Sequence, residues 1–120
     1  MFLKLYEELT FMIYYVDIDD TVFKVPYKGS IEYAKHVPIP ERIAHFNNLF
    51  DKGHEIHYFT ARGSRSKIDW FDLTEKQLLD AGAKFTSLNV GNKPHFDILI
   101  DDKAINAESY FLIHGIKGTI

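Results

Sequence analysis

Short apolar runs alternate with amphipathic stretches along the chain, and several of these runs end in polar residues. Runs rich in β-forming residues predict four strands, at residues 12–16, 55–60, 84–90 and 96–100. Apolar residues at helical spacing predict helices after Pro40 and after Thr74, and a short helix over residues 104–111. Because strands and helices alternate, we expect an α/β fold: a three-layer, Rossmann-like sandwich with a mainly parallel sheet.

The two longer helices have explicit start and stop signals. Pro40 suits the first turn of a helix, and Gly53 suits its end. Thr74 and Gln77 have the spacing of a capping box, which predicts that the next helix begins at Thr74. Gly82 then closes that helix.

The remaining segments indicate one domain, residues 1–120, without a separate cap domain. Residues 20–39 contain prolines and a central glycine turn between two β-like stretches, which predicts a small hairpin-like flap after the first strand. Residues 1–11 have two interpretations of similar weight: a short N-terminal helix, or a dispensable extension before an alternative start at Met12.

Composition narrows the function classes. Apolar residues make up 46% of the chain and aromatic residues 15%, which is enough for a single core. The net charge of -3 gives no basic face for nucleic acid, although a local patch would still serve. The absence of cysteine excludes thiolate zinc sites, and the six histidines show no metal-ligand spacing. No apolar run approaches the ~20 residues of a membrane helix, and no signal peptide is apparent, so we expect a cytoplasmic protein; the oligomeric state stays open.

Polar residues follow three of the predicted strands. Asp17 and Asp19 come after the first, Thr60 after the second, and the pair Asp101 and Asp102 after the fourth. If the strands are parallel, these side chains meet at the edge of the sheet where ligands bind. Crowded carboxylates repel one another, and a divalent cation that prefers oxygen ligands, such as Mg²⁺, would relieve that cost.

These positions resemble the four motifs of the haloacid dehalogenase (HAD) superfamily. Asp17-Ile18-Asp19-Asp20-Thr21-Val22 is similar to the first motif, Phe59-Thr60 to the second, Lys93 to the third and Ile100-Asp101-Asp102 to the fourth. Residues 59–63 and 93–104 also resemble small, capless HAD phosphatases linked to capsular polysaccharide or sugar-phosphate metabolism. One departure is that Lys93 lies only eight positions before Asp101, so a turn must deliver it to the site.

The resemblance implies a Mg²⁺-dependent phosphomonoester hydrolase that works through an aspartyl-phosphate. Asp17 would be the nucleophile, and Asp19 would protonate the leaving oxygen and then activate water. Thr60 would bind the phosphoryl group, and Lys93 would neutralise its charge. The implied Mg²⁺ ligands are Asp17, the backbone carbonyl of Asp19, Asp101, and Asp102 either directly or through water.

Without a cap domain, loops must select the substrate, which we expect to be a sugar phosphate or another small phosphorylated metabolite. The candidate substrate-binding residues are Arg62, Arg65, Tyr33, Lys35 and His36. One alternative is a nucleotidase or polynucleotide 3′-phosphatase. Another is a non-catalytic or receiver-like phosphoacceptor module, but receivers place the acceptor aspartate after the third strand, and residues 85–92 contain no acid.

Overall fold

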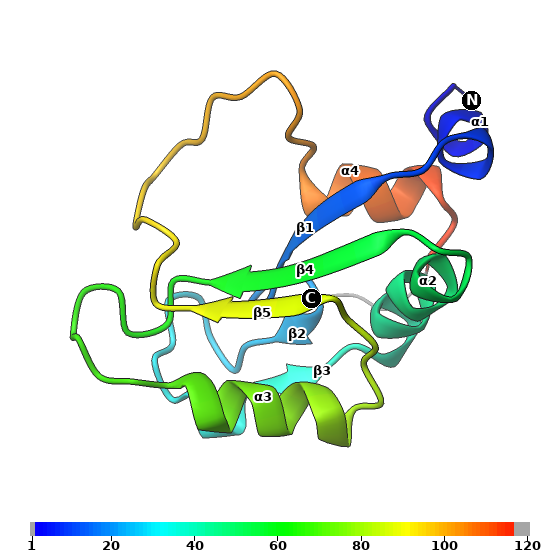
Figure 1. Cartoon of the computed structure of the whole chain (residues 1–120). Helices are drawn as coiled ribbons and strands as arrows, with labels where there is room; N and C mark the ends of the chain where they lie inside the picture. The colour runs from blue at the N-terminus through cyan, green and yellow to red at the C-terminus, as the bar shows by residue number, and fades with distance from the viewer. Residues whose placement is uncertain (1, 117–120) are drawn as a thin grey trace.

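The computed structural model describes residues 2–116, which form a parallel sheet with helices (Figure 1). The sheet has the strand order β1-β4-β5 and consists of β1 (Ile13–Asp17), β4 (Glu55–Thr60) and β5 (Ser87–Val90). Asp17 pairs with Phe59, and Thr60 pairs with Val90, so the carboxyl ends of the three strands share one edge. The predicted α/β class and the bounds of the 55–60 strand are therefore confirmed.

A two-stranded antiparallel ribbon of β2 (Phe23–Lys24) and β3 (Val37–Pro38) forms the flap predicted between the first strand and the first long helix. A short 3-10 helix, η1 (Tyr33–Lys35), lies between its strands. Phe23 is buried in the core, so the base of the flap packs onto the body of the domain instead of standing free.

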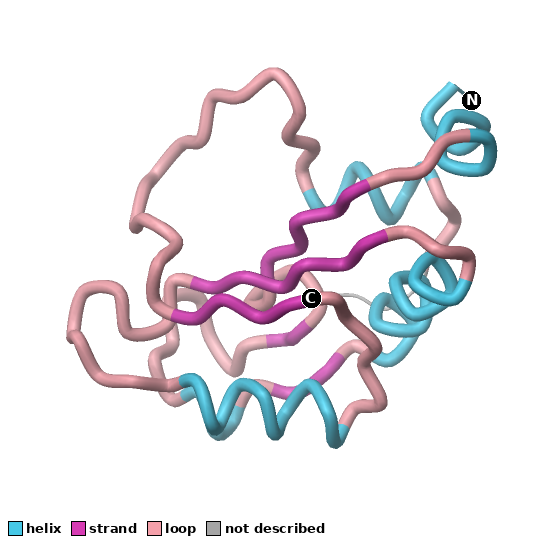
Figure 2. Tube along the Cα trace, viewed as in Figure 1, coloured by secondary structure: helices cyan, strands magenta, loops and turns pink. Residues whose placement is uncertain are grey.

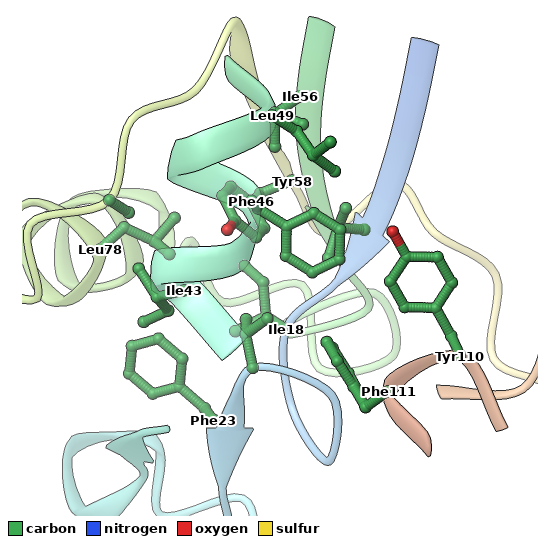
Figure 3. Packing of buried hydrophobic residues seen from close by; sticks show 13 residues of the cluster. Ile18, Phe23, Ile43, Phe46, Leu49, Ile56, Tyr58, Leu78, Tyr110 and Phe111 are labelled. Carbon is green, nitrogen blue, oxygen red and sulfur yellow. The ribbon is translucent and has the colours of Figure 1, made fainter. Parts of the chain in front are cut away.

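Four α-helices complete the described structure: α1 (Phe2–Leu9), α2 (Pro40–Asp51), α3 (Phe71–Asp80) and α4 (Ala107–Ile113). Apolar side chains of α2, α3 and α4 pack against one face of β1 and β4 (Figure 3). This core includes Val16, Ile18, Ile43, Phe46, Leu49, Ile56, Tyr58, Leu78, Tyr110 and Phe111. None of the helices within residues 2–116 is long and apolar enough to cross a membrane.

Within residues 2–116, no helix covers the opposite face of the sheet, so the third layer that the sequence predicted is not seen there. Tyr15 points to this face and is 67% exposed, with its ring stacked on His57 at 4.8 Å. The physical reason is visible in β4, where buried residues alternate with partly exposed ones. Alternation of this kind is typical of a strand with one covered face, whereas a three-layer sandwich needs strands buried on both faces.

The predicted fourth strand at residues 96–100 is wrong. This segment lies in a long loop between β5 and α4 (Figures 1 and 2). Ile98 is 78% exposed and Ile100 is 93% exposed. A run of β-forming residues favours extended backbone, but a strand also needs a partner edge, and residues 96–100 do not lie in either sheet.

The predicted start of α3 at Thr74 is also wrong. The helix begins at Phe71, whose backbone N–H donates to Asp69 Oδ1 at 2.9 Å. Thr74 lies inside the helix, and its hydroxyl donates to the Trp70 carbonyl at 2.7 Å. That hydroxyl is therefore occupied within the helix and does not cap it. The helix α2 does begin at Pro40, as predicted.

Candidate active site

A tight turn after β1 positions the first acidic motif. The carbonyl of Ile18 accepts hydrogen bonds from the backbone N–H groups of Thr21, Val22 and Phe23 at 2.9–3.2 Å. Asp20 adopts a left-handed conformation with φ 61°, which aspartate tolerates better than most residues. Ile18 is fully buried, so this turn is anchored in the core at the point where β1 ends.

Asp17 and Lys93 meet at this edge of the sheet, 76 positions apart in the sequence. Lys93 Nζ donates to Asp17 Oδ1 at 2.9 Å, and the hydroxyl of Thr21 donates to Asp17 Oδ2 at 3.2 Å. The Lys93 ammonium also lies 4.9 Å from the ring centre of Phe59. The structure therefore brings together the two residues that the sequence suggested as nucleophile and phosphate-neutralising lysine.

Thr60 ends β4, the strand next to β1, and its side chain is buried. Its hydroxyl oxygen accepts the backbone N–H of Arg62 at 3.2 Å. The strand pairing thus brings Thr60 to the same edge as Asp17.

Asp19 lies between two partners that the sequence had assigned to the substrate. Arg62 donates to both of its carboxylate oxygens, from Nε at 2.9 Å and from Nη2 at 2.8 Å. His36 Nδ1 lies 2.7 Å from Asp19 Oδ1. Burial alone would raise the pKa of Asp19, but the hydrogen bonds and charges of Arg62 and then His36 hold it below its usual range. The described arrangement thus favours the ionised form of Asp19.

Arg62 is the most buried charged group of this region, with 2% of its surface exposed. Its Nη1 donates to Thr74 Oγ1 at 3.1 Å and to Gln77 Oε1 at 2.6 Å. The guanidinium also lies 4.9 Å from the ring centre of Tyr33. Its bonding partners in the described structure are thus other residues of this chain, and the assignment of Arg62 to the substrate stays a prediction.

The other predicted substrate-binding residues divide into buried and exposed ones. His36 is buried between Asp19 and Ser30, and its assignment to the substrate likewise stays a prediction. Lys35 is exposed and pairs with Glu32 at 3.0 Å. Arg65 is exposed on the loop after β4.

The predicted metal ligands do not converge in the described conformation. Asp101 and Asp102 lie exposed on the long loop, where Asp102 pairs with Lys103 at 3.3 Å. A fourth strand at residues 96–100 was expected to place Asp101 and Asp102 at the sheet edge. Because this segment is a loop, the two aspartates do not lie beside the first motif. Asp17 and Asp19 are meanwhile engaged by cationic side chains. The four expected oxygen ligands therefore do not fit a Mg²⁺ ion without a rearrangement of the loop.

Like charges in the turn after β1 also perturb Asp20. The pKa of Asp20 is raised, first by burial and then by the charges of Asp19 and Asp17. Asp19 and Asp17 thus raise the cost of ionising Asp20. Lys93 and Arg62 offset this repulsion at two of the three aspartates.

A second titratable cluster lies away from this edge, and sequence reasoning missed it. Glu7, His45 and His114 come from α1, α2 and the end of α4. Burial, followed by the neighbouring charge of His114, lowers the pKa of His45 to about 4. Spacing gave no signal for this cluster, because its three members lie on separate helices.

Comparisons with known proteins bear on the fold. No family model matches the chain, and no curated protein matches it. A solved crystal structure of a structural-genomics target from Vibrio cholerae is similar, with a TM-score of 0.70 and 21% sequence identity. The match covers 82% of this chain and 86% of that chain. At this identity the similarity supports the α/β fold and says nothing of activity.

Proposed function

We propose that this chain is a phosphomonoester hydrolase of the HAD type, with Asp17 as its nucleophile. The observation that carries the proposal is the Asp17–Lys93 pair at 2.9 Å, with both side chains partly exposed at the carboxyl edge of the sheet. An anionic nucleophile must approach an anionic phosphate, and a fixed lysine beside it lowers that repulsion. Thr60, at the end of the neighbouring strand, would bind the phosphoryl group through its hydroxyl, which is buried in the described conformation.

The proposed reaction has two displacements at phosphorus. In the first, an Asp17 carboxylate oxygen attacks phosphorus, the ester P–O bond breaks, and the leaving oxygen takes a proton from the Asp19 carboxyl group. In the second, water attacks phosphorus and gives a proton to Asp19, while the bond between phosphorus and Asp17 breaks and inorganic phosphate leaves. Because Arg62 and His36 favour ionised Asp19, the described arrangement supports the second displacement more directly than the first.

Mg²⁺ would supply charge neutralisation on the phosphoryl oxygens. Its proposed ligands are the Asp17 carboxylate, the Asp19 carbonyl, and Asp101 with Asp102. Since these oxygens do not converge in the described conformation, the proposal includes a movement of residues 96–102 towards β1. Two features support this movement: β1 is an edge strand of its sheet, and the apolar side chains of Ile98 and Ile100 are exposed.

The substrate we propose is a sugar phosphate or another small phosphorylated metabolite. The flap of residues 20–39 follows the first motif in the sequence, and we expect it to shape the entrance to the site. A two-stranded ribbon is too small to enclose a substrate by itself. A screen of phosphorylated metabolites, scored by phosphate release, would identify the substrate class.

Hydrolysis of p-nitrophenyl phosphate tests the assignment of Asp17. We expect turnover that requires Mg²⁺ and falls to background in Asp17→Asn. The matched control is Asp20→Asn, a neighbouring aspartate without an assigned role, at a left-handed position that asparagine also tolerates. Undiminished activity of purified Asp17→Asn would refute the proposed nucleophile.

Hydrogen exchange tests the loop movement separately. We expect Mg²⁺ to protect the backbone amides of residues 96–102 in the wild-type chain, and Asp101→Asn to reduce that protection. Mg²⁺-dependent turnover without any protection of this segment would contradict the movement while leaving Asp17 as the nucleophile.

A further inference from the structure

Three helices bring a carboxylate and two imidazoles together on the side of the molecule where α1 meets α2 and α4. One ligand atom from each of Glu7, His45 and His114 can be chosen so that all three lie within 4.8 Å of one another. Glu7 is buried, and both histidines are partly buried. These residues have no role in the chemistry proposed for the Asp17 site.

The hydrogen bonds of His114 require a cation between this histidine and Glu7. His114 Nδ1 lies 2.8 Å from the carbonyl oxygen of Tyr110, which can only accept, so Nδ1 carries a proton. In the neutral imidazole, Nε2 then presents its lone pair, and it lies 2.5 Å from Glu7 Oε1. An ionised carboxylate oxygen is also only an acceptor. Two acceptors this close need a proton or a metal ion between them.

Two tyrosines fix the remaining groups of the cluster. The hydroxyls of Tyr14 and Tyr110 both donate to Glu7 Oε2, the latter at 2.7 Å, which leaves Oε1 for the cation. Because the Tyr110 hydroxyl has given its proton to Glu7, it accepts from His45 Nε2 at 2.8 Å. That bond makes Nε2 the protonated nitrogen of neutral His45, so a metal would have to bind this imidazole through Nδ1. Outer hydrogen bonds of this kind orient the ligands of metal sites.

The cluster borders a pocket of about 550 Å³. Glu7, His45 and His114 line it, and Lys4, Lys52 and His54 lie on its other walls. The pocket gives an ion a path to the cluster and room for a further ligand such as water or an anion.

We propose that Glu7, His45 and His114 form a binding site for a divalent transition metal, with Zn²⁺ as the best match. Two imidazoles and one carboxylate suit Zn²⁺, whereas Mg²⁺ and Ca²⁺ prefer oxygen ligands throughout. Ligand atoms about 2.0–2.1 Å from a tetrahedral Zn²⁺ are roughly 3.3 Å apart. The Glu7–His114 pair, at 2.5 Å, must therefore open by less than about 1 Å. A bound metal would tie α1 to α2 and α4.

Calorimetric titration of the full chain with Zn²⁺ tests this site. The chain is first treated with a chelator and then titrated with excess Mg²⁺ present, so that carboxylate sites which prefer oxygen-binding ions are occupied. We expect one Zn²⁺ per chain, and a loss of affinity of about 10-fold or more in both His45→Ala and His114→Ala. His95→Ala is the matched control, because this histidine is exposed on the long loop, and its affinity should equal that of the wild type.

X-ray absorption of the Zn²⁺-loaded wild-type chain gives a readout that does not depend on how the variants fold. We expect two imidazoles in the first coordination shell. A shell without imidazole, equal affinity in all three variants, or a wild-type chain that binds no Zn²⁺ would each overturn the proposal. If the wild-type chain binds no Zn²⁺, the cation between Glu7 and His114 is a proton, and the hydrogen bonds of the cluster serve to hold α1 against the rest of the domain.

Discussion

Arg62 and Asp19, 43 positions apart in the sequence, form a two-pronged ion pair in which Nε and Nη2 bind the two carboxylate oxygens at 2.9 and 2.8 Å. The guanidinium lies in the core, whereas the carboxylate is partly exposed at the sheet edge. The pair therefore connects the interior of the domain to the candidate active site. Its planar geometry fixes the orientation of Asp19, which a single flexible contact would not do.

Replacing Arg62 tests how far this pair stabilises the fold. We expect Arg62→Ala to lower the free energy of unfolding by roughly 3–5 kcal/mol, because it leaves Asp19 without its strongest partner and also strips Gln77 of a donor. Arg62→Lys should recover only part of the loss, since lysine cannot form the two-pronged pair. Urea denaturation measures both variants. The exposed Arg65 supplies the control, and a loss in Arg65→Ala as large as in Arg62→Ala would contradict the argument.

Gly63, directly after Arg62, is required by a close approach of the backbone. Its φ is +82°, and an added Cβ would lie 2.1 Å from the carbonyl oxygen of Ile68. Gly29 has nearly the same φ, +80°, with nothing within 4 Å of an added Cβ. We expect Gly29→Ala to cost about 1–2 kcal/mol from the left-handed conformation alone. Gly63→Ala should cost about 1–3 kcal/mol more from the clash, as measured by urea denaturation. Equal losses would show that the loop moves freely to admit the methyl group.

The sequence correctly predicted those helices and strands whose formation depends mainly on neighbouring residues. A run of β-forming residues predicted β4, and the fixed φ of Pro40 predicted the start of α2. The strand expected at residues 96–100 failed because pairing depends on a distant edge that a single segment does not specify. The start of α3 failed because Thr74 bonds back to Trp70 and to Arg62 instead of capping the helix.

At the candidate site, too, the sequence predicted local features better than contacts between distant segments. Motif spacing correctly placed Asp17 and Lys93 at one edge, since parallel strands and short turns leave little freedom there. Motif spacing does not show whether a side chain is buried, and Arg62 and His36, which were predicted to bind the substrate, are both buried beside Asp19. The Glu7 cluster escaped notice because helix packing, and not sequence spacing, brings its members together.

Lys93 offers a test of the proposed electrostatics at the candidate site. If it neutralises the phosphoryl group, Lys93→Met should lower the turnover of p-nitrophenyl phosphate by about 10²–10³-fold, as does the loss of other donors that stabilise a developing charge. The unfolding free energy should change much less, because the ammonium is partly solvated. Lys84→Met is the control, since that lysine is exposed and pairs with Asp51, which has no role in the proposed chemistry. Comparable turnover of the two variants would remove Lys93 from the mechanism.

Glu7 decides whether residues 1–11 are a dispensable extension or part of the fold. Its buried carboxylate accepts hydrogen bonds from Tyr14 and Tyr110, and His114 lies against its other oxygen. In Glu7→Gln, the amide oxygen can still accept from both tyrosines and the NH₂ group can donate to Nε2 of neutral His114, but the charge that pairs with a protonated His114 is lost, so charge-assisted hydrogen bonds become neutral ones.

We expect Glu7→Gln to lower the free energy of unfolding by about 1–3 kcal/mol, measured by urea denaturation with a chelator present so that no metal contributes. Glu8→Gln makes the same chemical change at the next residue, which is exposed, and should leave stability within about 0.5 kcal/mol of the wild type. Equal stability of the two variants would mean that the Glu7 carboxylate does not stabilise the fold, and would favour the interpretation of residues 1–11 as a dispensable extension. A loss confined to Glu7→Gln would show that α1 is held by its buried carboxylate.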